Sequence, residues 1–317
     1  MTLGASVRAV AGASGDGAVD WAAVERAASA AVSPGDVRLS SAERDAYAAD
    51  VRAARDAIRP VAGLAFDVPR TVEIQHRHHW IGAAVDTFER ILAPLDDAPV
   101  RFPGVTRTVN TATMAAALAY LADHVLGQYD PLLLADGAAD HRLYFVHPNV
   151  ERAAVALDVS RDRFRRWIAF HEVAHAAEFA AAPWLPGYLE DRLRATVTAL
   201  EAGDLERSSM AELTLAMTAI EGYAELLMDR SFDRPVEDLR ERLDARRRGG
   251  GPVAGLVRRL LGLELKRRQY ERGRAFFDAV AAARGLAGAA RVWDDPANLP
   301  TEAELEDPSR WLRRVGP

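Results

Sequence analysis

Three residues on one predicted helix have the types and the spacing that can bind a metal ion and use it. His171, Glu172 and His175 form the pattern HExxH within residues 161–180. Residues four apart on an α-helix lie on the same face, so the two imidazoles can converge on one cation. Glu172 lies beside them and could take a proton from a water molecule. The pattern therefore indicates metal-assisted hydrolysis, and it requires a further ligand from elsewhere in the chain.

The helix that carries this pattern places both histidines on its apolar face. That face repeats at steps of four, three, four and four through Phe164, Ile168, His171, His175 and Phe179. A polar group buried on such a face is unfavourable unless a partner satisfies it. A shared metal ion would satisfy both imidazoles at once. A pair of core histidines bonded to carbonyl groups is the alternative interpretation.

A second predicted helix, at residues 208–230, contains the candidate third ligand. Its apolar face runs through Met210, Thr214, Met217, Glu221, Ala224 and Met228. A buried carboxylate without a partner is unfavourable, so we expect Glu221 to face a metal ion or, alternatively, an arginine. Glu225, one turn further on, could hydrogen-bond a ligating histidine or Glu221. Gly222 would let another helix or the metal approach closely.

Two histidines and one glutamate would leave one position of a tetrahedral zinc ion open to water, which is typical of catalytic zinc sites. One bound zinc ion would lower the pKa of that water and polarise a scissile carbonyl. Glu172 would then act as the general base and pass the proton to the leaving amine. Tyr223, His147 and nearby arginines are candidates for stabilising the oxyanion. The same ligands also accept manganese, cobalt or iron.

A short strand at residues 143–147 precedes the metal-binding helix, and we expect Pro148 to end it. An extended peptide can pair with the edge of a strand. His147 and Asn149 could then face the substrate. The helix that follows is expected to begin after Ser160 as its N-cap.

The remaining patterns predict a mainly α fold, of the α+β type with a small sheet. A second short strand is expected at residues 70–76. Helices are expected at 20–32, at 41–59, within 78–94 and at 110–126. The second has a capping box of Ser40 and Glu43 and a stop at Pro60, and the fourth is capped by Asn110 or Thr111. Further helices are expected after Pro186 to about 202 and over most of the chain from 234. Trp293 and Trp311 are expected to anchor the C-terminal segment.

The domain organisation follows from length and composition. We expect a flexible N-terminus at 1–17, rich in Gly, Ala and Ser, followed by a single domain at 18–317. Residues 18–105 could form an N-terminal helical lobe of that domain. The N-terminus lacks the apolar core of a signal peptide, and no stretch approaches a membrane span, so a cytoplasmic protein is expected.

Composition also narrows the function. The chain of 317 residues contains no cysteine, which excludes thiol catalysis and thiolate metal sites, and it has neither GxSxG nor a phosphate-binding loop. The net charge of −6 gives no general reason for nucleic-acid or membrane binding, and the basic cluster at 246–248 is interleaved with acids and lacks an aromatic platform. His76, His78 and His79 could form a second metal site only through an awkward turn, so ordinary structural roles are expected.

Several segments together resemble a known family. HEVAH followed by EGYAE is similar to the zincin superfamily, in which HExxH is paired with a downstream ExxxD or ExxxE helix whose first glutamate is the third ligand. The runs GQYDPLL, YFVHPNV, FRRWIAFHEVAHAAEF, APWL, IEGYAELLMD and NLPTEAELEDPSRWL resemble a family of uncharacterised zincin-like hydrolases, some of whose members are named for an association with biosynthesis of the deazaflavin redox coenzyme. This resemblance covers roughly residues 70–317.

The resemblance implies a zincin-like helical metalloprotease core with an HExxH helix and a facing ExxxE helix. It also implies ligand roles for His171, His175 and Glu221, and a base role for Glu172. It implies no particular substrate. We therefore expect a zinc-dependent metallohydrolase, a metallopeptidase with a peptide or small amide substrate. The alternative is a non-catalytic zinc-binding regulatory or scaffold protein of the same fold.

Overall fold

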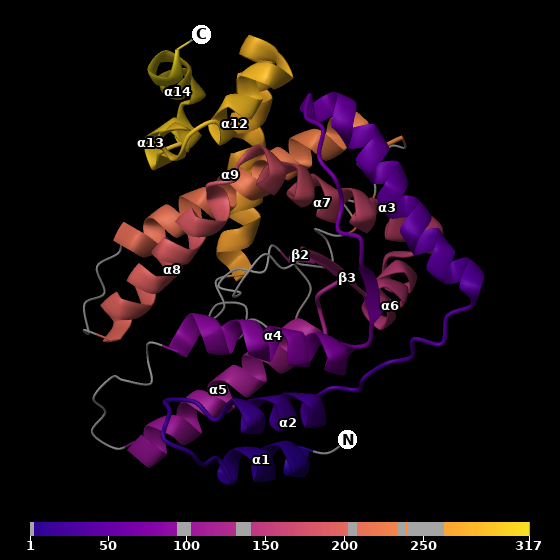
Figure 1. Ribbon diagram of the computed structural model, residues 1–317, viewed down its shortest axis with the longest axis vertical. Coiled ribbons are helices and arrows are strands. Elements are labelled where there is room, and N and C mark those ends of the chain that lie inside the picture. Colours follow the sequence, from indigo (N-terminus) through magenta and orange to yellow (C-terminus); the bar gives the residue numbers. More distant parts are fainter. Residues whose placement is uncertain are drawn as a thin grey trace.

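The computed structural model describes residues 3–93, 103–130, 141–201, 208–233, 239, 242 and 263–316. It consists mostly of helices around one small sheet (Figure 1). The predicted mainly α fold with a small sheet is confirmed. The basic cluster at 246–248 lies outside the described residues.

The helices are α1 (Leu3–Ala11), α2 (Trp21–Ala31), α3 (Ser41–Ala62), α4 (Arg77–Leu92), α5 (Pro103–Ala122), α6 (His147–Leu157), α7 (Arg161–Ala181), α8 (Leu185–Glu201), α9 (Ser208–Ser231), α12 (Leu263–Ala290), α13 (Glu302–Glu306) and α14 (Pro308–Val315). The strands are β1 (Val72–Gln75), β2 (Gly127–Asp130) and β3 (Arg142–Val146). Within the described ranges, no helix is long and apolar enough to cross a membrane.

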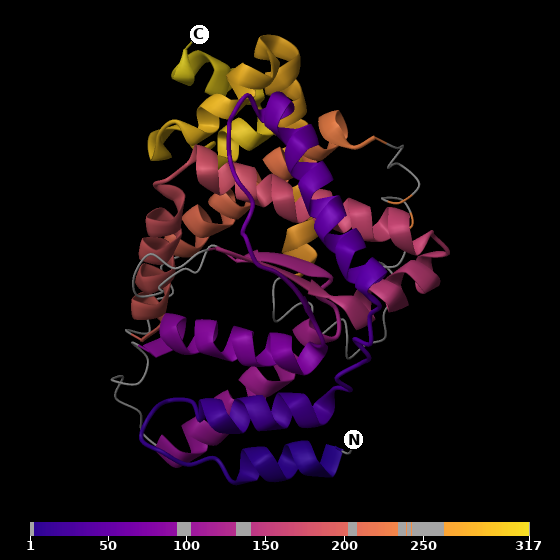
Figure 2. The ribbon, with the colours of Figure 1, turned by 45° about the vertical axis from the view of Figure 1, so that its right-hand side comes forward.

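Two hydrophobic cores divide the molecule into a lower and an upper part, whose helices Figure 2 shows after a turn of 45° from Figure 1. The lower lobe consists of α1, α2, α4 and α5, and its core includes Trp21, Trp80 and Leu118. The upper part contains α3, α6, α7, α8, α9, α12, α13 and α14, with Trp293 and Trp311 buried in its core as predicted. The lobe therefore differs from the expected 18–105, because α3 packs on α7 and α5 joins the lobe. The segment predicted to be flexible contains α1, which packs on α2.

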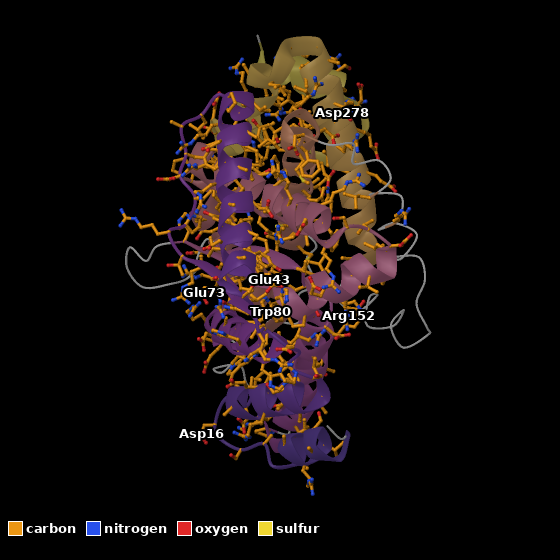
Figure 3. All side chains as sticks on the ribbon, turned by 90° about the vertical axis from the view of Figure 1, so that its right-hand side faces the viewer. Asp16, Glu43, Glu73, Trp80, Arg152 and Asp278 are labelled. Carbon is orange, nitrogen blue, oxygen red and sulfur yellow. The ribbon has the colours of Figure 1, made fainter. Side chains whose placement is uncertain are left out.

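The junction between the two parts has apolar and polar contacts, and Val146 of β3 is buried in the core of the lower lobe. Figure 3 shows Trp80 and Arg152 at mid-height, between Asp16 at one end of the molecule and Asp278 at the other. Trp80 Nε1 donates a hydrogen bond to Gln128 Oε1 at 2.9 Å, which joins α4 to β2. Arg152 NH1 lies 2.6 Å from Asp123 Oδ1. The first contact joins the lobe to the sheet, and the second joins the turn after α5 to α6.

The sheet has the order β1-β3-β2, with β1 parallel to β3 and β2 antiparallel to it. β3 is therefore the central strand, and both of its edges are already paired. The prediction that a peptide pairs with this strand is wrong for that reason. β3 ends at Val146, and Pro148 lies in the first turn of α6. Proline is tolerated there because the backbone N–H groups of a helix's first turn have no intrahelical partner.

Helix ends agree with the sequence in part. The capping box of Ser40 and Glu43 is present in α3, but the helix continues through Pro60 and ends at Gly63 with a φ of 64°. α5 begins at Pro103, and Thr111, a predicted cap, instead accepts a hydrogen bond from the Asp20 backbone N–H at 3.0 Å. Ser160 is the N-cap of α7, although its side chain makes no capping bond.

α9 and α12 cross at glycines, which brings their backbones into contact. A Cβ on Gly222 would lie 2.4 Å from the carbonyl carbon of Gly273, and one on Gly273 would lie 2.2 Å from the Thr218 carbonyl oxygen. Gly222 follows Glu221 directly, so this crossing fixes the part of α9 that carries that carboxylate. The prediction that Gly222 permits a close approach is confirmed, and the approaching element is a helix.

Gly273→Ala is expected to lower the free energy of unfolding by about 1–3 kcal/mol, because a methyl group would force the two helices apart. Denaturant unfolding measures this loss. Gly187→Ala in the first turn of α8 is the matched control, since nothing lies within 4 Å of its added Cβ. Equal unfolding free energies for the two variants would contradict the close crossing.

Candidate metal centre

α7 and α9 bring two imidazoles and one carboxylate together. His171 and His175 retain 17% and 13% of their side-chain exposure, and Glu221 retains 9%. One turn earlier on α7, the Trp167 ring stacks on the His171 ring at a centroid distance of 6.2 Å. The three side chains are thus shielded but still reach solvent. Among the described residues, they are the one group of this kind that could hold a metal ion.

The three candidate ligand atoms form a compact triangle. The Nε2 atoms of His171 and His175 are 3.2 Å apart, and they lie 3.7 and 3.8 Å from Glu221 Oε2. Tetrahedral zinc with bonds of about 2.0–2.1 Å separates its ligands by about 3.3–3.4 Å. The triangle is therefore close to the size that such an ion requires.

A buried carboxylate orients the second histidine from behind. Glu178 is fully buried, and its Oε2 lies 2.8 Å from His175 Nδ1. Nδ1 of His175 can therefore donate to Glu178, which leaves Nε2 directed at the cluster. We had not predicted this residue, although its position three residues after the histidine in HEVAHAAE is a local signal that could have revealed it.

The electrostatics of the cluster favour a positive charge. Burial acts to lower the pKa of His175, but the hydrogen bond and charge of Glu178, with contributions from Glu221 and Glu172, raise it above its ordinary value. Burial raises the pKa of Glu178, and its bond to His175 opposes that rise. A cation bound here would compensate several buried carboxylates at once.

Glu172 lies beside the cluster and contacts the sheet. Its side chain is only 6% exposed, and Oε2 accepts a hydrogen bond from the Tyr129 backbone N–H at 2.7 Å. The sequence did not predict β2 as a strand, because its four residues GQYD show no strong β-branched pattern. This strand forms one edge of the described sheet and lies against α7.

The sequence profile of the zincin-like metallopeptidases matches residues 19–209 and 197–312, which together cover most of the chain. The chain belongs to the zincin-like metallopeptidase family. It is also similar to a protein of known structure from Chloroflexus aurantiacus, described as a candidate hydrolase with a novel fold. The two are 32% identical with a TM-score of 0.77, over 94% of this chain and 98% of the other. No curated protein matches the chain.

Membership of the zincin-like family implies a metal ion, usually zinc. The residues fit one, because two imidazole nitrogens and a carboxylate oxygen are a donor set that zinc accepts. The distances between these three atoms are also close to those in a tetrahedral zinc site.

The two residues predicted to face substrate have other contacts in this zincin-like protein. Asn149 is 1% exposed, accepts a hydrogen bond from Arg77 Nε at 2.7 Å, and donates to the carbonyl oxygens of Ala122 and Val125. His147 Nδ1 lies 3.0 Å from the Tyr47 hydroxyl. Both residues lie at the start of α6, where they bind neighbouring helices, so the substrate-facing role is not supported.

The other two candidates lie on α9. The Tyr223 ring is 3% exposed and packs against Phe277 and Trp293 at centroid distances of 5.2 and 5.6 Å. Two residues along a helix turn the side chain by about 200°, so Tyr223 faces a different side from Glu221. Glu225 is half-buried and lies one turn after Glu221 on α9, and its hydrogen bond to a ligating histidine or to Glu221 stays a prediction.

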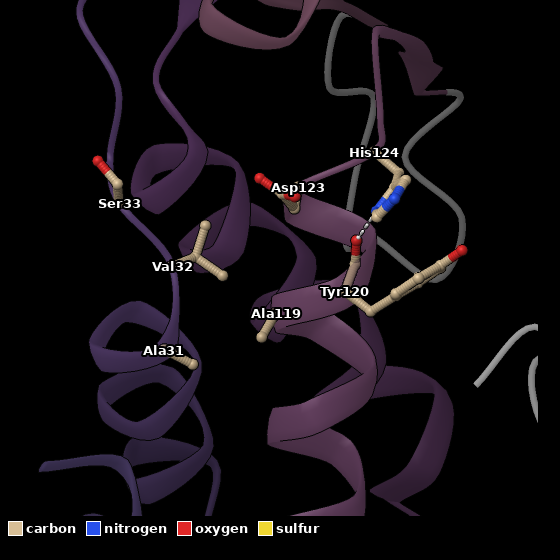
Figure 4. A pocket seen from close by; sticks show the side chains of 7 residues that line it. All are labelled: Ala31, Val32, Ser33, Ala119, Tyr120, Asp123 and His124. Carbon is tan, nitrogen blue, oxygen red and sulfur yellow. Dashed lines mark hydrogen bonds between the residues drawn. The ribbon is translucent and has the colours of Figure 1, made fainter. Parts of the chain in front are cut away.

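Two further features have residues of the types that form binding sites. His76, His78 and His79 do not form a metal-binding group in the described structure; His76 caps α4, and His78 Nε2 lies 2.8 Å from the Val32 carbonyl oxygen. A cavity of about 340 Å³ lies between α2 and α5 (Figure 4). Two of its polar side chains have partners, since His124 Nδ1 lies 2.7 Å from the Tyr120 carbonyl oxygen and Asp123 accepts a hydrogen bond from Arg152. Neither feature offers chemistry comparable with that of the cluster.

Glu178→Gln is expected to weaken zinc binding between about 10-fold and 100-fold, because the amide keeps an acceptor for His175 but loses the charge. Competition with a chromophoric chelator measures the affinity. Glu302→Gln is the control, because it also removes a carboxylate charge, but from an exposed residue of α13. If both variants bind zinc as tightly as the unaltered protein, Glu178 does not support the metal centre.

Proposed function

We propose that this protein is a zinc-dependent metallohydrolase, and within that class a metallopeptidase. The observation that carries the proposal is the convergence of His171, His175 and Glu221 with a buried carboxylate, Glu172, beside them. The family and the similarity to a candidate hydrolase support the broader class. Zinc as the metal and cleavage of a peptide bond are the specific parts of the proposal.

In this proposal, Nε2 of His171, Nε2 of His175 and a carboxylate oxygen of Glu221 hold the zinc ion. When bound, zinc supplies a Lewis acid that makes a water molecule more acidic and polarises a carbonyl group. Glu178 fixes the ring of His175 through Nδ1, so that Nε2 stays directed at the ion. Trp167 limits the movement of the His171 ring by stacking on it.

Glu172 acts as the general base. It accepts the proton of the attacking water on a carboxylate oxygen and donates it to the nitrogen of the leaving amine. Its burial removes competing water, and the Tyr129 N–H restrains its carboxylate. Each of these steps is a proton transfer that a single carboxylate can perform.

The substrate class is a peptide or a small amide. β2 is the sheet strand beside Glu172, so a substrate bound at the metal centre would lie nearer to β2 than to the central β3. A cytoplasmic location remains a prediction from the sequence.

Two substitutions separate the metal site from the chemistry. His171→Ala is expected to abolish stoichiometric zinc binding, because it removes one of three ligands. Glu172→Gln is expected to keep zinc and lower turnover by about 10²–10⁴-fold, because it removes the base while retaining an acceptor for Tyr129. Metal analysis of the purified protein and cleavage of a broad peptide library measure the two effects.

His124→Ala is the matched control, since this histidine lies in the turn after α5 and its Nδ1 contacts the Tyr120 carbonyl oxygen. It should retain both zinc and turnover. Stoichiometric zinc in His171→Ala would exclude the ligand assignment. Full zinc binding without any cleavage that depends on Glu172 would favour the non-catalytic zinc-binding alternative.

A further inference from the structure

The outer edge of β2 faces Glu172. β2 and β3 pair antiparallel with Gly127 opposite Phe145 and Gln128 opposite Tyr144. The Val146 N–H donates to the Leu126 carbonyl, so the ladder bonds fall at 126 and 128 and the backbone groups at 127 and 129 face away from β3. The outward N–H of Tyr129 is the one that donates to Glu172 Oε2.

A glycine lets the strand come this close to α7. A Cβ on Gly127 would lie 2.9 Å from Ile168 Cγ2 and 3.0 Å from both Cγ and Oε1 of Glu172. Any larger residue at this position would push the strand or the carboxylate aside. β2 and α7 lie side by side in both ribbon views (Figures 1 and 2).

We propose that the backbone of β2 positions the general base, with Tyr129 as the hydrogen-bond donor and Gly127 as the residue that permits the contact. A glutamate side chain has several rotatable bonds, and a hydrogen bond to a charged carboxylate is strong enough to select one conformation. A displacement of about 1 Å in a reacting group can cost about 100-fold in rate. The kinetic part of this proposal rests on the proposed function, whereas the contact itself does not.

Amide hydrogen exchange, read residue by residue, tests the contact without any turnover. Glu172→Ala removes the acceptor, so exchange at the Tyr129 amide should accelerate by about tenfold or more, the factor expected for the loss of about 1.4 kcal/mol of protection. Glu172→Gln keeps an acceptor and should retain most of the protection. The Gln128 amide, which faces β3, is the internal reference and should not change.

Unchanged exchange at Tyr129 in Glu172→Ala would overturn the contact. An equal acceleration at Gln128 and Tyr129 would also overturn it, because that result would show a loosening of the whole strand and no specific bond.

Gly127→Ala tests the positioning role in the zinc-loaded enzyme. We expect full zinc content, a KM within about twofold of the original, and a kcat lowered between about 10-fold and 100-fold. Gly187→Ala is the matched control, since its added methyl group meets nothing within 4 Å. An unchanged kcat in Gly127→Ala would overturn the positioning role.

If Gly127→Ala does not fold, an amide-to-ester replacement at the Tyr129 backbone nitrogen removes the donor and leaves every side chain in place. A lowered kcat with full zinc supports the proposal, and an unchanged kcat overturns it. The two proposals fail in distinguishable ways. Loss of Tyr129 protection in a protein without turnover would reject the peptidase and keep the contact, whereas turnover that depends on Glu172 but not on the ester would reject the positioning role alone.

Discussion

The burial of three carboxylates against two imidazoles is the constraint on which the rest of this structure depends. Glu172, Glu178 and Glu221 retain only 6%, 0% and 7% of their exposure, and they lie on two helices that pack together. Bringing like charges out of water is unfavourable unless a cation compensates them. Burial acts to lower the pKa of His175, but the neighbouring carboxylates, Glu178 first, raise it above its ordinary value. A bound metal ion would provide the positive charge without protonation of His175.

Such a cluster forms only if its two helices stay together. α7 and α9 are each in close contact with a neighbouring helix. Asp50 on α3 is 8% exposed and accepts a hydrogen bond from Arg165 on α7 at 2.7 Å. α9 is fixed by its glycine crossing with α12, directly beside Glu221. α3 thus supports α7 through buried apolar side chains and this ion pair, and α12 supports α9 through the glycine crossing.

The sequence predicted the candidate metal ligands, because their positions follow from helical spacing. His171 and His175 are four residues apart, and Glu221 interrupts an apolar stripe, so their convergence could be inferred before any tertiary contact was known. The fold class followed from the same periodicity. The sequence pattern predicts that Asn149 and His147 follow a strand and face substrate, whereas Pro148 lies in the first turn of α6 and both residues contact neighbouring helices. β2 could not be predicted, since a strand of four mostly polar residues depends on β3 and α7 for its stability.

The strand that was missed connects the two parts of the molecule. Gln128 accepts a hydrogen bond from Trp80 of the lower lobe, and the next residue, Tyr129, donates to Glu172 of the upper part. Side chains stand on the faces of a sheet, whereas backbone N–H groups lie in its plane, so the Gln128 side chain and the Tyr129 N–H can contact different parts of the molecule. Because the two residues are adjacent, both contacts act on the same short strand. The lower lobe contributes none of the three candidate ligands, yet its contact with Gln128 constrains the strand that fixes Glu172.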